Sequence, residues 1–103
     1  MVAVVCVAYK AGGKFDMDYY LKTHMPLVQK TWASFGLKSW KVAQYTNPDS
    51  IYAVVAWLEF EEQSQWEKAS TAPEAGPVFA DIPNFSDVAP DKLIGTLTGS
   101  ATC

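Results

Sequence analysis

Four stretches of the chain are rich in apolar and β-branched residues and have the length of β-strands. Residues 2–9 (VAVVCVAY) and 51–60 (IYAVVAWLEF) are apolar at nearly every position, which is typical of central strands buried on both faces. Residues 37–46 (LKSWKVAQYT) alternate in part, and residues 91–98 (DKLIGTLT) form the last such run. We therefore expect four strands, with the first and third in the middle of a sheet.

Two helices are predicted between these strands. Asp16 is a suitable N-cap for a first helix that runs to about Phe35, and Gly36 is a suitable residue to end it. A second helix is expected over residues 61–70.

The resulting order, β-α-β-β-α-β, is that of the ferredoxin-like split βαβ fold. It gives an α+β domain with a four-stranded antiparallel sheet and both helices on one face. Residues 71–90 are rich in Pro, Gly and Ala, so we expect a loop with room for one short helical turn around residues 77–81. A single domain is predicted over residues 1–98, followed by a disordered tail over residues 99–103.

Composition indicates that the other face of the sheet is covered. Apolar residues make up 50% of the 103 residues and charged residues only 18%, below the roughly 25% of typical domains. Because the central strands are apolar on both faces, the face without helices needs a partner. Two sheets packed face to face in a homodimer are the simplest solution.

Charge and hydropathy argue against several partners. The formal net charge is -3 and no basic patch exists, so we expect no nucleic acid. The apolar runs are too short to span a bilayer, so we expect no membrane partner and a cytoplasmic location. Cys6 lies in a strand-like run and Cys103 is the last residue, so no disulfide is expected. One histidine and two distant cysteines cannot form a nitrogen/sulfur zinc site, and no metal is predicted.

The only histidine, His24, lies in the first predicted helix. At about 100° per residue, the neighbours within roughly 60° of it are Met17, Tyr20, Leu21, Leu27, Val28, Thr31 and Phe35. His24 is therefore expected in the middle of the buried stripe, facing the sheet. Pro26 falls near the outer face, where it should bend the helix around the core.

A buried imidazole needs hydrogen-bond partners, because leaving it unpaired costs about 1–3 kcal/mol. Two interpretations remain open. His24 is a core residue satisfied by Tyr20 and a backbone carbonyl, or the space beneath it is a pocket in which His24 donates or accepts a proton.

Aromatic residues make up 14% of the chain. Trp57 shares a strand face with the smaller Ala53 and Val55, which suits the lining of a slot as well as packing in a core or dimer interface. For Phe79 and Phe85, anchoring of the long loop is the alternative to ligand contact. The candidate substrate-binding residues are Trp57, Trp40, Tyr45, Tyr52, Trp66, Phe79, Phe85 and Asn84.

Three segments resemble the EthD-like family. Residues 15–27 (FDMDYYLKTHMPL) resemble its signature, residues 36–40 (GLKSW) continue it, and residues 81–86 (DIPNFS) resemble a second family segment. The resemblance covers nearly the whole chain. It implies a homodimeric α+β barrel, with a pocket in each subunit between the sheet and the helices.

Proteins of this wider superfamily include cofactor-free monooxygenases, lactone isomerases and polyketide cyclases. The founding EthD members accompany a cytochrome-dependent system for ether degradation, and fungal members act as decarboxylases or dehydratases on aromatic polyketide intermediates. The resemblance therefore implies a hydrophobic ligand but does not determine the reaction.

The resemblance places the family histidine at His24 and the family tyrosine pair at Tyr19 and Tyr20. On the helical wheel only Tyr20 faces the pocket, so we assign Tyr19 no chemical role. Asp81 either orients His24, as an aspartate does in hydrolase triads, or caps the backbone of its own loop. The same alternatives apply to Asn84.

The preferred hypothesis is a cofactor-independent lyase or isomerase that acts on a small aromatic or polyketide-like substrate by decarboxylation, dehydration or a proton shift. His24 is its general acid/base, Tyr20 a hydrogen-bond donor to developing oxyanion charge, and Asp81 the orienting group. The alternative is a non-catalytic small-molecule-binding or accessory protein of an oxidative degradation system. Related barrels also suggest a haem site with His24 as axial ligand as a minor alternative, and we expect no cofactor.

Overall fold

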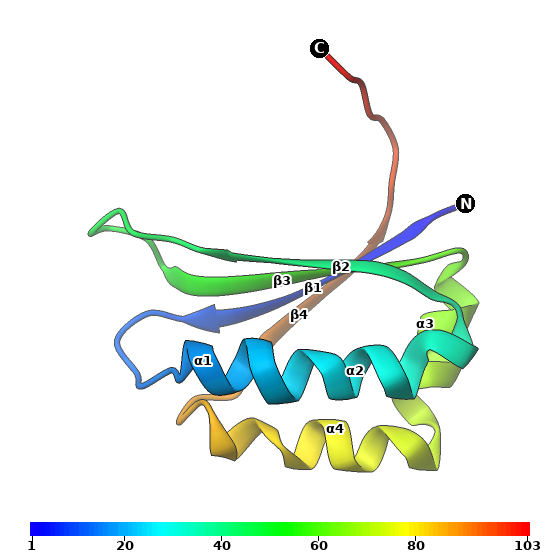
Figure 1. The fold of residues 1–103 in the computed structure, drawn as a ribbon. Helices are drawn as coiled ribbons and strands as arrows, with labels where there is room; N and C mark the ends of the chain where they lie inside the picture. Colours follow the sequence, from blue (N-terminus) through cyan, green and yellow to red (C-terminus); the bar gives the residue numbers. More distant parts are fainter.

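The four predicted strands form one antiparallel sheet. The computed structural model describes residues 1–103, with β1 (Ala3–Lys10), β2 (Leu37–Gln44), β3 (Tyr52–Phe60) and β4 (Asp91–Thr96). Their order is β2-β3-β1-β4, so β1 and β3 are central, as their apolar sequences predict (Figure 1). All strand ends lie within two residues of the predicted ones. The predicted ferredoxin-like α+β fold is confirmed.

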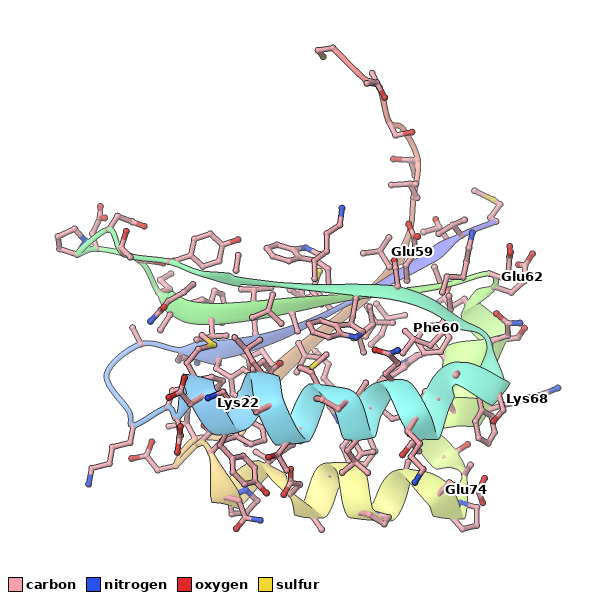
Figure 2. The ribbon with its side chains drawn as sticks, in the orientation of Figure 1. Lys22, Glu59, Phe60, Glu62, Lys68 and Glu74 are labelled. Carbon is pink, nitrogen blue, oxygen red and sulfur yellow. The ribbon has the colours of Figure 1, made fainter.

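Alternation along the strands gives the sheet two different faces. Phe60 in β3 is fully buried beneath the helices, whereas its neighbour Glu59 lies on the other face (Figure 2). Trp57 has the same parity as Glu59 and pairs with Cys6 of β1. Trp57 and Cys6 therefore belong to the face that carries no helix, which we call the open face.

The open face is apolar at its centre. Ala8 is 1% and Val55 8% exposed, whereas Leu93, on the edge strand β4, is 57% exposed. The structure contains a single chain, so the homodimer that would cover this face stays a prediction.

The first helical segment is not the uniform helix predicted over residues 16–35. It consists of α1 (Met17–Tyr19), a π-helical turn (Tyr20–His24), α2 (Met25–Trp32) and a 3-10 turn (Ala33–Phe35). Its ends are the predicted ones. At the start, the side chain of the N-cap residue Asp16 accepts a hydrogen bond from the Tyr19 amide at 3.1 Å. The glycine just past the segment has a φ of 104°, a left-handed conformation that favours glycine.

Pro26 accounts for the π-helical turn. Proline has no amide hydrogen, and in a regular α-helix its ring clashes with the carbonyl four residues earlier, here that of Lys22. The chain forms one wider turn just before the proline, in which the Met25 amide bonds the Tyr20 carbonyl five residues back. Side chains before this turn are therefore out of phase with a wheel drawn at 100° per residue.

The second predicted helix is α3 (Gln63–Thr71). It begins with a capping box, in which the Glu62 side chain accepts from the Gln65 amide and the Gln65 side chain accepts from the Glu62 amide. The predicted range of 61–70 is shifted by one or two residues.

Residues 71–90 are largely helical: the short turn predicted around residues 77–81 is present, but much of the expected loop around it is helical as well. A 3-10 turn (Pro73–Ala75), α4 (Gly76–Ala80) and a second 3-10 turn (Ile82–Asn84) follow one another. In Figure 1 this segment runs alongside α1 and α2. The helical layer therefore has three members instead of two.

Proline and burial explain this segment. Each of its three pieces has a proline in its first turn, where the missing amide hydrogen costs no helical hydrogen bond. Ala75, Val78 and Phe85 are at most 3% exposed, so packing against the core stabilises helical pieces that are too short to form alone.

The end of the chain differs from the rest. Residues 97–103 belong to no helix or strand and lead away from the sheet in Figure 1. None of the helices combines the length and the apolar character needed to cross a bilayer.

Candidate functional site

His24 is the last residue of the π-helical turn and is buried at 4% exposure. Its Nδ1 lies 2.9 Å from Oδ2 of Asp81, which is 57 residues further along the chain. Asp81 therefore reaches the imidazole, and its carboxylate bonds no backbone amide of its own segment. The core-histidine interpretation required a hydrogen bond between Tyr20 and the imidazole, and the structure has none.

The Asp81 carboxylate accepts three side-chain hydrogen bonds. Besides His24, the Tyr19 hydroxyl donates to Oδ1 at 2.5 Å and the Asn84 amide donates to Oδ1 at 2.9 Å. Burial raises the pKa of Asp81, but these hydrogen bonds together outweigh it and hold the pKa below its usual value. The carboxylate is therefore an anion at neutral pH.

Tyr19 has a place that the helical wheel missed. The wheel assumed a regular helix, but the π-helical turn changes the phase between Tyr19 and His24, and Asp81 approaches both from the helical segment beside them. Tyr20 instead stacks on the imidazole, with ring centroids 5.4 Å apart and planes at 14°. The cavity described below is lined by Tyr20 and not by Tyr19, as the wheel predicted, but the wheel did not predict the hydrogen bond from Tyr19 to Asp81.

His24 is held as a neutral base. Burial lowers the pKa of its imidazole, and the hydrogen bond and negative charge of Asp81 oppose this shift only in part. The neutral ring donates from Nδ1 to the Asp81 anion, which leaves Nε2 with a free lone pair. Nε2 makes no hydrogen bond in the protein, yet no fully enclosed polar side-chain atom lacks a partner, so Nε2 reaches open space.

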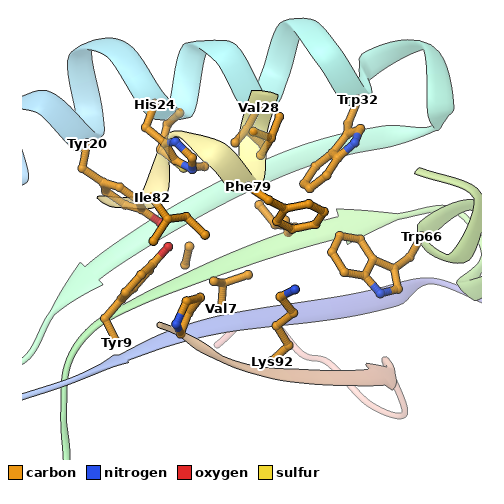
Figure 3. A pocket seen from close by; sticks show the side chains of 15 residues that line it. Val7, Tyr9, Tyr20, His24, Val28, Trp32, Trp66, Phe79, Ile82 and Lys92 are labelled. Carbon is orange, nitrogen blue, oxygen red and sulfur yellow. The ribbon is translucent and has the colours of Figure 1, made fainter. Parts of the chain in front are cut away.

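That open space is a cavity between the helices and the sheet (Figure 3). It is lined mainly by hydrophobic side chains and has a volume of about 30 Å³, which is room for about two water molecules. The cavity is therefore narrow. Its wall includes Tyr9, Tyr20, His24, Trp66, Phe79 and Lys92.

A larger open groove adjoins the cavity. The groove has a volume of about 550 Å³, and Phe79, Ile82 and Pro90 line both spaces. These three side chains form the partition between groove and cavity. The Lys92 ammonium lies 4.3 Å from the centre of the Phe79 ring and packs over it.

Comparison with known proteins places this fold. No family model matches the chain, and no curated protein is similar to it in sequence. An EthD-like protein from Ralstonia eutropha JMP134 has a similar structure, with a TM-score of 0.85, 21% identity, and coverage of 98% of this chain and 96% of that one. This chain has the EthD-like fold.

Two further structures agree. A protein of the ethyl tert-butyl ether D family from Bacillus halodurans C-125 matches this chain with a TM-score of 0.71 at 20% identity, covering 95% of this chain and 99% of its own. A mutant of SnoaB, a cofactor-independent oxygenase from Streptomyces nogalater, matches with a TM-score of 0.62 at 14% identity, covering 96% and 94%. The resemblance inferred from the motifs is thus confirmed at the level of the fold.

Four of the predicted substrate-binding residues lie away from the cavity. Trp57 and Tyr45 pack together with ring centroids 6.4 Å apart, and Trp57 is on the open face. Trp40 donates from Nε1 to Gln29, and Tyr52 donates to Asp91. None of these four lines the cavity beside His24; for Trp57 the reason is that sequence alone does not tell which parity of β3 faces the helices.

The other four surround the site in different ways. Trp66 and Phe79 line the cavity. Phe85 is buried against the imidazole of His24, with ring centroids 4.5 Å apart, and does not line the cavity. Asn84 reaches Asp81 and no part of the cavity wall.

Tyr9 and Lys92 are cavity residues that sequence reasoning missed. Lys92 pairs with Val7 across β1 and β4, which puts its side chain on the helix face. Tyr9 has the parity of Val7 along β1, and this alternation was the signal that could have found it. The structure brings no three His, Cys, Asp or Glu side chains together as metal ligands.

Proposed function

We propose that this EthD-like protein is a cofactor-independent lyase or isomerase in which His24 transfers a proton on a small aromatic or polyketide-like substrate. One observation carries the proposal. A neutral imidazole, buried and hydrogen-bonded through Nδ1 to an anionic carboxylate, presents its free Nε2 to an apolar cavity.

The geometry suits a base that becomes an acid. Nε2 takes a proton from a substrate carbon or hydroxyl, the resulting imidazolium is stabilised by Asp81 and exchanges its proton with water, and a proton is then returned from Nε2 to the substrate. Decarboxylation, dehydration and a proton shift all need such a transfer. Asp81, Tyr19 and Asn84 are positioning residues in this scheme, since they act through His24.

The place of the ligand follows from the sizes of the cavity and the groove. Ligand sites usually measure about 300–1,000 Å³, so the cavity alone is too small for an aromatic substrate. We propose that the ligand lies in the groove and enters the cavity when Phe79 turns aside, with its reacting end under His24. Trp66 then offers an aromatic wall.

A similar fold supports chemistry without a cofactor. SnoaB, one of the structural neighbours, is a cofactor-independent oxygenase. This likeness supports the class of protein and leaves the reaction to the site itself.

We also propose that the protein is a homodimer through the open face. Val55 is largely shielded there, but Leu93 and Tyr45 are exposed at 57% and 39% in the single chain. Packing of two such sheets removes these apolar side chains from water.

Hydrogen–deuterium exchange at the α-carbon of 2-tetralone tests the proton transfer, because it needs no knowledge of the natural substrate. Exchange in D₂O is followed by NMR with wild type and His24→Gln. We expect the variant to lose about 10²–10⁴-fold in rate, the usual contribution of a general acid/base. The matched control is Lys22→Gln on the exposed side of the same turn. Full exchange by a folded His24→Gln protein would refute the mechanism.

The second candidate function is binding without catalysis. The narrowness of the cavity favours it, because a ligand held mainly in the groove stays away from Nε2. In that case aromatic ketones bind and neither exchange nor turnover exceeds the rate without protein.

A further inference from the structure

Two buried tyrosines meet at the cavity, and neither has a polar partner. Tyr9 on β1 is 2% exposed and Tyr20 in the π-helical turn is 1% exposed. In Figure 3 Tyr9 rises from the sheet and Tyr20 descends from the helix toward the same part of the cavity. Their rings meet edge to face with centroids 5.9 Å apart.

The two hydroxyls are available as donors. Neither hydroxyl has a hydrogen-bond partner among the protein groups, and no fully enclosed polar side-chain atom is unpaired. Each hydroxyl must therefore reach the open space of the cavity that both residues line. Buried polar groups are nearly always satisfied, so an unpaired pair at a cavity wall points to a polar atom that enters from outside.

Their protonation state supports this role. Burial raises the pKa of Tyr9, with a further contribution from Tyr20, and burial also raises the pKa of Tyr20. Both hydroxyls keep their protons at neutral pH. They donate hydrogen bonds and would strengthen them as negative charge develops on an acceptor oxygen.

We infer that Tyr9 and Tyr20 together bind the carbonyl oxygen of a ketone substrate, as a two-donor site for the enolate that forms when His24 removes an α-proton. The inference names the substrate class of the proposed function and rests on it for the enolate step. In that step the α C–H bond breaks, its proton moves to Nε2, and the electron pair forms the C=C bond while the carbonyl π electrons move to oxygen. Reprotonation reverses these changes, so the step needs no oxidant and no reductant.

Binding of 2-tetralone, compared with tetralin, tests the oxygen site. Tetralin has the same ring system and no carbonyl. Binding is followed by tryptophan fluorescence, since Trp32 and Trp66 line the cavity. For 2-tetralone we expect each of Tyr9→Phe and Tyr20→Phe to raise the Kd about fivefold to tenfold, the effect of one lost hydrogen bond. Tetralin binding should be unchanged.

The carbonyl stretch of bound 2-tetralone gives a second readout. Hydrogen bonds lower its frequency, so the band should shift down in wild type, less in each single variant, and not at all in the double variant. Tyr45→Phe, a tyrosine that does not line the cavity, is the matched control and should behave as wild type. Equal losses for ketone and hydrocarbon, or an unshifted band in wild type, would overturn the inference.

The outcomes separate this inference from the proposed function. If the band shifts in wild type but no α-proton exchanges, the oxygen site stands and the catalytic proposal fails. If exchange depends on His24 but is indifferent to Tyr9→Phe and Tyr20→Phe, the catalytic proposal stands and the oxygen site is wrong.

Discussion

His24 and Asp81 form a hydrogen-bonded pair, with 2.9 Å between Nδ1 and Oδ2, that joins the π-helical turn to the segment after α4. Both side chains are largely shielded, His24 at 5% and Asp81 at 12% side-chain exposure. In such surroundings a hydrogen bond to a charged group is worth more than one at the surface. The pair therefore sets the tautomer and orientation of the only imidazole in the chain.

Replacing Asp81 with Asn should lower the pKa of His24 further. The Asp81 anion is the group that opposes the effect of burial, so its removal leaves burial unopposed. The α-proton exchange rate should fall about 10²-fold, within the range that general acid/base groups contribute. NMR titration of the imidazole C–H signals measures the pKa without ambiguity, because the chain has one histidine.

Two companion variants sharpen this test. Tyr19→Phe removes one of three donors to Asp81 and should have a smaller effect in the same experiments. Asp18→Asn, an exposed aspartate in α1, should leave the titration curve of His24 as it is. An unchanged imidazole pKa in Asp81→Asn would mean that the pair has no electrostatic coupling.

Stability should fall as the pH is lowered from 7 to 5. The pKa of His24 is lower in the folded protein than its ordinary value of 6.5, so the unfolded chain binds more protons in this window. The free energy of unfolding should decrease by at most about 1.4 kcal/mol per pH unit below 6.5, until the pH reaches the folded pKa. Urea unfolding at several pH values measures this slope.

The slope can be assigned to one residue. The pKa of Asp81 is lowered by folding, so this carboxylate stabilises the fold at any pH above its unfolded pKa. The stabilisation is lost only in more acidic solution, as the pH falls through the folded pKa. In His24→Gln the slope between pH 7 and 5 should largely vanish. If that variant keeps the wild-type slope, other groups control the acid sensitivity.

Replacing Phe79 with Ala should join the cavity to the groove. Phe79 lines both spaces, and its removal also takes away the ring under Lys92. We expect faster association of 2-tetralone, by about tenfold if turning of the ring limits entry. Stopped-flow tryptophan fluorescence measures the rate, and Phe35→Ala, outside both spaces, is the control. An unaltered association rate would place the entrance elsewhere.

Replacing Leu93 with Asp should separate the proposed dimer. A carboxylate buried in the interface costs several kcal/mol, which is at least about 100-fold in the dimer dissociation constant. Light scattering coupled to size-exclusion chromatography measures the mass. Leu21→Asp, a leucine 41% exposed on the helical side, is the matched control and should leave the mass as in wild type. A wild-type protein that is monomeric at high concentration would contradict the proposal.

Periodicity and capping residues determine most of the fold from the sequence. Strands buried on both faces read as continuous apolar runs, so β1 and β3 could be placed at the centre of the sheet. Asp16 and Gly36 mark the ends of the first helical segment because their side-chain and backbone preferences act locally. The same reasoning put His24 on the buried face.

Tertiary contacts decide the rest of the site. The residue range 71–90 lacks a helical pattern, and its short pieces are helical only because Val78 and Phe85 pack on the core. This packing places Asp81 beside His24, although the two residues are 57 positions apart in the sequence. No local sequence pattern predicts this contact. The direction of the Tyr19 side chain relative to His24 depends on the π-helical turn, and a helical wheel with a constant angle per residue does not represent such a turn.

The sequence alone thus determines which residues are buried and where chain segments begin and end, because these properties depend on neighbours one to four positions away. Only the folded structure decides which carboxylate orients His24, which face of β3 meets the helices, and that Tyr9 joins Tyr20 at the cavity. These relations join separate elements, and they depend on how the helical layer is placed on the sheet.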